Sequence, residues 1–295
     1  MQKATQALCN WLDDHLDRFR YVPGAGMDCF EHIKPLGEYI LILYSFSRLG
    51  YKTTFPALHR WVTTKGHILQ RMVDDFGGDI DWELVPGAIT NNPVNASALF
   101  MFRALKAITG KATKWDSYIE PAFEKAGLSM ETGNIGVLFA ADICGLGNCH
   151  DRAVAALFEV IKSGNALLFS SLYLVTHYIF YATKMGLRPI TIFAPREHTL
   201  KIFLQKALAI SIEKENYDIA GELVMCMNWV GCPDNPEYEY GLKMLSDIIS
   251  IHGYVPNISR RPPEKVDDFN RNYHPSLVAL AAIGHSQIAD KLIAI

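Results

Sequence analysis

Six apolar runs in this 295-residue chain each close on a glycine that polar or basic residues soon follow. The six glycines are Gly50, Gly110, Gly147, Gly186, Gly231 and Gly284. Glycine is the usual residue after the C-terminal end of a helix, because it adopts the left-handed backbone conformation without a Cβ clash. An amphipathic stretch follows each glycine, so the pattern predicts six helical hairpins.

Six buried inner helices surrounded by outer helices would form a closed α/α toroid. We expect inner helices at 35–49, 95–109, 134–146, 167–185, 219–230 and 275–283, and outer helices at 4–18, 55–73, 114–125, 152–162, 196–214, 236–251 and 287–295. Pro35 and Pro275 suit the first position of a helix, and Asn95 and Asn134 suit N-caps. Strand alternation is nearly absent and no linker interrupts the pattern, so we expect one all-α domain over residues 1–295.

The glycines are unequally spaced, which argues against an open solenoid of identical repeats and suits a ring with insertions. The two largest insertions, 74–92 and 252–272, are rich in Gly, Pro, Asp and Asn and lack helical periodicity. Long loops in compact domains are often functional. We therefore expect both insertions to lie as loops over or beside the mouth of the ring.

Composition limits the classes of function. The formal net charge is −3 and no basic stripe occurs, which argues against a general nucleic-acid binder. The six cysteines are scattered, and acidic residues interrupt the N-terminal segment before any apolar core develops, so we expect a reduced, cytoplasmic protein without a signal peptide. Residues 166–183 form an uncharged run of eighteen residues, for which a buried central helix is favoured over a membrane span.

Four titratable residues interrupt the apolar inner helices. His177 and Glu222 each lie nine residues before their glycine, His274 lies ten before Gly284, and Glu38 lies twelve before Gly50. Matching depth predicts that these side chains face one central cavity, where a carboxylate beside an imidazole can perform acid/base chemistry. The alternative is that each is a core polar group with a hydrogen-bond partner on another helix.

The starts of the inner helices suggest a binding surface. In a toroid these starts converge on one mouth, and their dipoles attract anionic groups. Residues near the starts are Tyr39, Tyr273, Asn95 and Asn134, which we assign to substrate binding together with Tyr181, a hydrogen-bond donor near His177. The alternative for the two asparagines is helix capping alone.

Metal-binding motifs are weak. Cys144, Cys149 and His150 form C-x4-C-H, which is not the paired C-x-x-C arrangement of structural zinc sites. Residues 13–17 match the DDxxD string that holds magnesium in terpene synthases, but they fall on an outer helix where a solvated charged face is expected. We therefore expect no metal site and no cofactor.

Four stretches, 30–48, 176–188, 217–223 and 273–281, resemble an all-helical bacterial family known as a domain of unknown function and often found near natural-product gene clusters. In shape the chain looks like the terpenoid-cyclase and protein-prenyltransferase toroids. The last hairpin of those proteins often carries a Tyr-His pair like Tyr273-His274, the histidine being a zinc ligand in prenyltransferase β subunits. Those subunits add a D-x-C pair at the start of an inner helix, whereas Asp142 and Cys144 lie near a helix end, which argues against that zinc chemistry.

The favoured function is therefore a small-molecule biosynthetic enzyme, of the natural-product tailoring kind, that works by acid/base chemistry in a central cavity. In this interpretation His177 and His274 carry protons, and Glu222 and Glu38 are their partners or substrate anchors. A non-catalytic protein that binds a peptide or carrier-bound intermediate in the same groove is the main alternative, and a structural subunit of a larger complex is a third. No nucleic-acid or membrane partner is expected.

Overall fold

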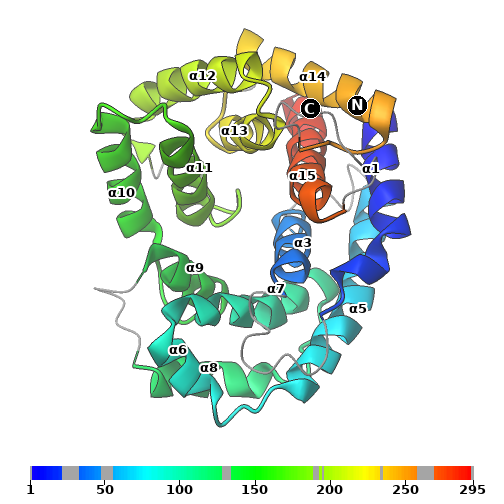
Figure 1. Ribbon diagram of the computed structural model, residues 1–295, viewed down its shortest axis with the longest axis vertical. Coiled ribbons are helices and arrows are strands. Elements are labelled where there is room, and N and C mark those ends of the chain that lie inside the picture. The colour runs from blue at the N-terminus through cyan, green and yellow to red at the C-terminus, as the bar shows by residue number, and fades with distance from the viewer. Residues whose placement is uncertain are drawn as a thin grey trace. The chain divides into compact units, whose positions relative to one another are not determined.

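The computed structural model describes residues 2–21, 33–47, 56–127, 134–188, 193–194, 196–232, 235–257 and 269–293. Regular structure in these ranges is entirely helical, with no strand (Figure 1). The sequence-based prediction of an all-α protein is confirmed at this level. None of the helices in the described ranges combines the length and apolar character needed to cross a bilayer.

The chain divides into two compact units. One unit joins Met1–Arg18 to Val154–Ile295, and the other is Phe19–Ala153. The helices of the first unit are α1 (Gln2–Asp14), most of α10 (His150–Lys162), α11 (Phe169–Thr183), α12 (Glu197–Glu213), α13 (Tyr217–Trp229), α14 (Pro236–His252) and α15 (Phe269–Ile293). The helices of the second are α3 (Lys34–Ser45), α5 (Pro56–Asp79), α6 (Val85–Asn91), α7 (Phe100–Thr109), α8 (Asp116–Lys125) and α9 (Ile135–Ile143), and it also holds the 3-10 helix η3 (Pro93–Leu99), while η1 (Leu16–Phe19) lies at the junction.

Helix α13 is the centre of the first unit. It lies between α11 and α15, and α12 and α14 also pack on it (Figure 1). Its side chains from Ile219 to Met227 are all buried, and each fully buried aliphatic side chain contributes about 1.5–3 kcal/mol. A carboxylate on this helix, Glu222, is therefore surrounded by core on every side.

Helix α7 has the corresponding place in the second unit, where it packs on α3, α5 and α9. The last turns of α5 pack so closely on Trp115 that only glycine fits at position 77. A Cβ on Gly77 would lie 2.3 Å from Trp115 Cδ1. The indole of Trp115 also donates a hydrogen bond to the Asp74 carbonyl at 2.9 Å. These contacts fix the end of α5 against the segment that leads into α8.

Asparagine and glycine set several helix ends, as the sequence predicts. Asn134 caps α9 by accepting a hydrogen bond from the Gly136 amide at 2.8 Å, and Asn216 caps α13 through the Ile219 amide at 3.3 Å. Gly110 ends α7 in the left-handed conformation, with φ of 73°. The predicted ends at Gly147, Gly186 and Gly231 fall within a few residues of the ends of α9, α11 and α13. Gly50 lies outside the described residues.

The last predicted hairpin is wrong. Pro275 does not begin a helix and Gly284 does not end one, since α15 runs through both from Phe269 to Ile293. Packing overrides both signals: Phe269 stacks on Trp11 of α1 with ring centroids 6.1 Å apart, and Ile283 and Ser286 on either side of Gly284 are buried. The predicted helices 275–283 and 287–295 are thus parts of one element.

The prediction that 74–92 is a loop is also wrong. Helix α5 continues to Asp79 and α6 occupies Val85–Asn91, because Phe76, Val85 and Ile89 are buried and hold these turns in the core. The second insertion, 252–272, falls partly outside the described residues, namely at 258–268. In its described part Val255 is buried, and its amide donates a hydrogen bond to the Ser276 hydroxyl at 3.1 Å. A lid role for either segment stays a prediction.

The apolar run at 166–183 forms α11, which is not buried all round. Phe169, Tyr173 and Leu174 are exposed by 61%, 44% and 40%, while Leu172, Val175 and Ile179 are buried. Only one side of α11 packs on α13, so the expected fully buried central helix is corrected to a helix with an apolar exposed face.

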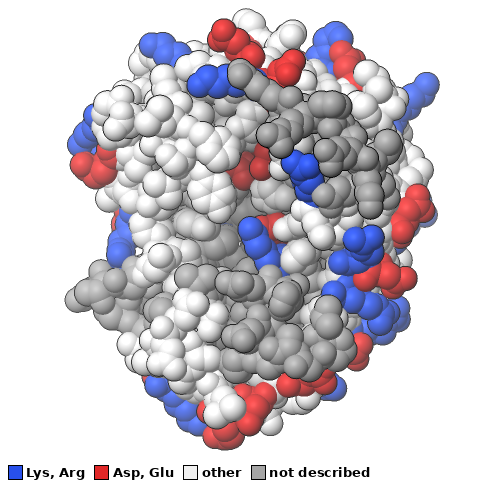
Figure 2. Space-filling model, viewed as in Figure 1, with Lys and Arg blue, Asp and Glu red and all other residues white. Residues whose placement is uncertain are grey.

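Charged side chains are mixed in sign on the surface. On the face drawn in Figure 2, Lys and Arg side chains lie among Asp and Glu side chains, and no broad area of either sign occurs among the described residues. This distribution agrees with the absence of a basic stripe in the sequence.

Candidate carboxylate–histidine site

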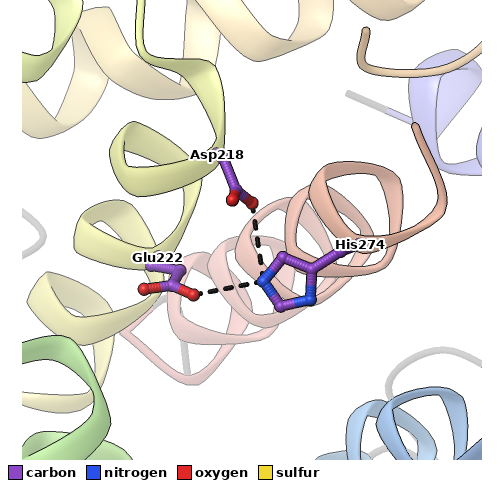
Figure 3. A group of neighbouring side chains, drawn as sticks. All are labelled: Asp218, Glu222 and His274. Carbon is purple, nitrogen blue, oxygen red and sulfur yellow. Dashed lines mark hydrogen bonds and ion pairs between the residues drawn. The ribbon is translucent and has the colours of Figure 1, made fainter. Parts of the chain in front are cut away.

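Two helices of the first unit bring three ligating side chains together. On α13, Asp218 and Glu222 are four residues apart and so lie on one helix face. His274 of α15 points its Nε2 at both, 3.3 Å from Glu222 Oε1 and 3.5 Å from Asp218 Oδ1 (Figure 3). One imidazole nitrogen is therefore shared by two carboxylates.

The second oxygen of Glu222 faces α11. Thr176 Oγ1 donates a hydrogen bond to Glu222 Oε2 at 2.5 Å, and His177 Nδ1 lies 4.0 Å from the same oxygen. The Glu222 side chain is only 1% exposed. Each of its oxygens is thus held by a different helix, which fixes the orientation of the carboxylate in the core.

Glu222 is ionised despite its burial. Burial alone raises the pKa of this carboxyl, but the hydrogen bond to His274, the positive charges of His177 and His274 and the Thr176 hydroxyl together lower the pKa below its ordinary value. A buried carboxylate of this kind needs positive charge nearby. Here that charge comes from groups that can gain or lose a proton.

His177 has a defined tautomer when neutral. Its Nδ1 lies 2.8 Å from the Tyr173 carbonyl, which can only accept, so Nδ1 carries the hydrogen and the lone pair is on Nε2. The ring lies tilted against Tyr173 with centroids 3.8 Å apart and meets Tyr181 edge-on at 6.0 Å. Since the His177 side chain is 19% exposed, it links the buried carboxylate to the surface of the unit.

Cys226, one turn beyond Glu222, is not a nucleophile at neutral pH. Its thiol is buried and lies 3.8 Å from the Thr176 carbonyl. Burial, with a smaller effect of the Glu222 charge, raises the pKa of the thiol well above its usual range.

Of the four predicted catalytic residues, the structure brings His177, Glu222 and His274 together. Glu38 belongs to the other unit, on α3, where it forms an ion pair with Lys34 at 3.6 Å. Its approach to the other three residues stays a prediction.

The predicted substrate-binding residues are placed as follows. Tyr181 lies beside His177, and the buried Tyr273 stacks on Phe269 with centroids 5.4 Å apart. In the second unit Tyr39 is fully buried and packs on Phe19, and Asn95 Nδ2 donates to the Ala88 carbonyl at 3.2 Å. Asn134 is an N-cap as predicted, whereas Asn95 is not, because it lies within η3 and α7 begins only at Phe100 with Leu99 at its N-cap. A role in substrate binding stays a prediction for all five.

Sequence reasoning missed Asp218 and Thr176. Asp218 had a readable signal, since a D-x-x-x-E spacing places two carboxylates on one helix face. Thr176 had none, because a threonine in an apolar helix usually bonds to its own backbone, as Thr176 also does with Tyr173 O at 3.0 Å.

Among the described residues, one group of three side chains could hold a metal ion: Asp218, Glu222 and His274, whose ligand atoms all lie within 4.8 Å of one another. Cys144, Cys149 and His150 form no such group in the described part of the chain. The Cys149 thiol instead lies 3.4 Å from Asp142 Oδ2, and His150 pairs with Asn148 and Asp151. Asp13, Asp14 and Asp17 are exposed, as expected for a solvated face.

The model of one family, Domain of unknown function (DUF6895), matches residues 5–284. No curated protein and no solved structure matches the chain.

Proposed function

Because the chain belongs to the DUF6895 family, whose description assigns no activity, we propose from the site itself that the protein is an enzyme performing acid/base chemistry on a small molecule. The observation that carries the proposal is a fully buried, ionised carboxylate, Glu222, held between two imidazoles that come from two other helices. Perturbed carboxylates of this kind gather at functional sites.

The roles follow from the contacts. Glu222 stays ionised and stabilises a proton on His274 or His177, as a buried carboxylate does behind a catalytic histidine. His177 suits the group that meets the substrate, because its Nδ1 is engaged by the Tyr173 carbonyl and its neutral ring carries the lone pair on Nε2. Tyr181 is beside it and would supply a hydrogen bond.

The substrate would have an apolar part. The exposed side chains Phe169 and Tyr173 continue along α11 toward His177 at four-residue intervals, which gives one aromatic stripe. The natural-product substrate class comes from the sequence resemblance alone. A closed α/α toroid with Glu38 in the same cavity, and a cytoplasmic location, are further parts of the proposal.

The second candidate is a non-catalytic binding protein. The exposed apolar residues Leu168, Phe169, Tyr173 and Leu174 at the start of α11 favour it, because exposed apolar surface also suits capture of a peptide or carrier-bound intermediate.

The experiment is to incubate purified protein with a mixture of small metabolites and follow depletion and new masses by mass spectrometry. Wild type is compared with His177→Ala and with Glu159→Gln, an exposed carboxylate on α10 paired with Lys162, as control. We expect wild type and control to convert a compound that His177→Ala leaves unchanged. The free energy of unfolding of His177→Ala should stay within about 1 kcal/mol of wild type, since water can replace a part-exposed ring.

If all three proteins bind a compound equally and none converts it, the result favours the non-catalytic binding protein. If His177→Ala lowers the free energy of unfolding by about 1–3 kcal/mol and leaves conversion of the compound unaltered, His177 belongs to the core and has no catalytic role.

A further inference from the structure

We propose that Asp218, Glu222 and His274 bind a divalent transition-metal ion, with zinc as the ion that fits best. The inference rests on the site of the proposed function but not on any turnover there. It also reverses the expectation of no metal site, which rested on the cysteine spacings, on the DDxxD string and on the misplaced D-x-C partner of the Tyr273-His274 pair.

The spacing of the ligand atoms fits an ion. Oxygen and nitrogen ligands lie about 2.0–2.1 Å from zinc, so neighbouring ligands of a tetrahedral ion are about 3.3–3.4 Å apart. His274 Nε2 is 3.3 Å from Glu222 Oε1 and 3.5 Å from Asp218 Oδ1. The two carboxylate oxygens also fall within the 4.8 Å limit that encloses the group, so small side-chain rotations would complete the triangle.

The charge of the cluster also calls for a cation. Two carboxylates, one of them fully buried, face one imidazole nitrogen. A single proton on His274 leaves this group of three with one net negative charge, whereas a divalent ion with a neutral His274 brings it to zero. Buried charge is costly unless it is neutralised, and a divalent ion would neutralise both carboxylates at once.

The surroundings resemble those of a metal site. The Glu222 oxygen that faces away from His274 accepts the Thr176 hydrogen bond, and such outer contacts orient ligating carboxylates. Three protein ligands leave one position of a tetrahedral ion for water or substrate, as in catalytic zinc sites. Mixed nitrogen and oxygen donors disfavour magnesium and favour zinc over manganese.

With the ion bound, His274 is a ligand and the proton-carrying role falls to His177, whose Nδ1 is only 4.0 Å from the other oxygen of Glu222. The ion would supply Lewis acidity to a bound oxygen. His177 would then act beside the ion rather than on it.

The test is a titration of chelator-treated full-length protein with zinc, followed by calorimetry and by metal analysis after dialysis. We expect one zinc per chain, and we expect Asp218→Asn and His274→Gln each to weaken binding by about 100-fold or more, because each removes a direct ligand. Glu159→Gln, which removes the same charge at an exposed position, should bind as wild type does. Cobalt added in place of zinc should give the visible spectrum of nitrogen and oxygen ligands, without thiolate bands.

Zinc affinity that is the same in Asp218→Asn, His274→Gln and wild type would overturn the inference, as would a cobalt spectrum with thiolate bands. Circular dichroism of each variant, recorded without metal, separates lost ligation from lost folding. If zinc does not bind, the metal site is contradicted but the proposed acid/base chemistry of His274 and Glu222 is not. If zinc binds and no metabolite is converted, the metal site is supported and the proposed enzymatic function is contradicted.

Discussion

The two units each bury a carboxylate in an apolar helix, and they satisfy it in opposite ways. Asp142 of α9 is 2% exposed and its Oδ2 accepts from the Cys149 amide at 3.1 Å and from the Cys149 thiol at 3.4 Å, seven residues along the chain. Glu222 of α13 is 1% exposed and is held by Thr176 and His274, which are 46 and 52 residues away.

The difference separates a structural carboxylate from a functional one. A backbone amide cannot change its charge, so the contact of Asp142 with the Cys149 amide fixes the turn after α9. The imidazoles around Glu222 can change their charge, so this carboxylate is coupled to proton or metal occupancy. Burial alone would rank the two residues together, and only the chemistry of their partners distinguishes them.

The largest expected effect is on stability, from removing each carboxylate in turn. Asp142→Ala should lower the free energy of unfolding by about 2–3 kcal/mol, because a charged acceptor is lost and the Cys149 amide is left in the core. Glu222→Leu should lower it by less than about 1 kcal/mol or raise it, because the cost of burying the charge is removed and the imidazoles left behind are partly exposed to water.

In Glu222→Leu the former partners keep other contacts, His274 with Asp218 and Thr176 with the Tyr173 carbonyl. Urea denaturation of both variants measures the contrast, with Asp142→Asn as the variant that retains an acceptor. Equal losses from Asp142→Ala and Glu222→Leu would break the distinction between the two carboxylates.

A smaller effect is expected from His285, an imidazole of α15 that meets Trp229 edge-on with centroids 5.5 Å apart. Burial lowers the pKa of His285 to about 3. The unfolded chain binds a proton at this residue below about pH 6.5 and the folded chain does not, so stability should fall as the pH drops from about 6.5 toward 3.

The contribution of His285 is at most about 1.4 kcal/mol per pH unit in that window, because one bound proton separates the two states, and we expect a smaller slope since the residue is partly exposed. Unfolding midpoints of wild type and His285→Gln, measured from pH 7 to pH 4, isolate the contribution of His285 to the pH dependence of stability. If the two proteins lose stability in parallel as the pH falls, His285 makes no such contribution. The result sharpens the comparison, since burial governs the pKa of His285, whereas the Nε2 of His274 lies within 3.5 Å of two carboxylate oxygens.

The smallest effect is expected at a solvated carboxylate. Glu159 is 73% exposed and pairs with Lys162 at 3.0 Å, so Glu159→Gln should change the free energy of unfolding by at most about 0.5 kcal/mol. Thermal and urea unfolding at low and high salt measure it. A loss comparable to that of Asp142→Ala would show that charge removal itself, and not burial, governs the series.

How far the sequence predicts the molecule depends on which interactions fix each feature. Local signals held where the end of a helix is set by neighbouring residues, as at Asn134 and Gly110. They failed at Pro275 and Gly284, where packing of α15 keeps the backbone helical, and at 74–92, where Phe76 and Val85 join the core.

At the candidate site, counting residues back from the glycines brought His177, Glu222 and His274 onto one list. The count for His274 relied on Gly284, which is not a helix end, so that residue was found through an incorrect premise. Asp218 was readable from its spacing to Glu222, while the Thr176 contact depends on the three-dimensional approach of α11 to α13, which no pattern in the sequence encodes.

The first unit is assembled from both ends of the chain, and this has a kinetic consequence. Helix α1 packs on α14 and α15, and Gln287 donates a hydrogen bond to Thr5 across 282 positions. Such long-range contacts form late, because the entropy cost of bringing distant parts of the chain together precedes the favourable energy of the contacts. During synthesis α1 emerges before α14 and α15, so the apolar face bearing Leu8 and Leu12 lacks these two packing partners until α15 is made. The unit that holds Glu222 and His274 therefore becomes resistant to proteolysis only after α15 has been made.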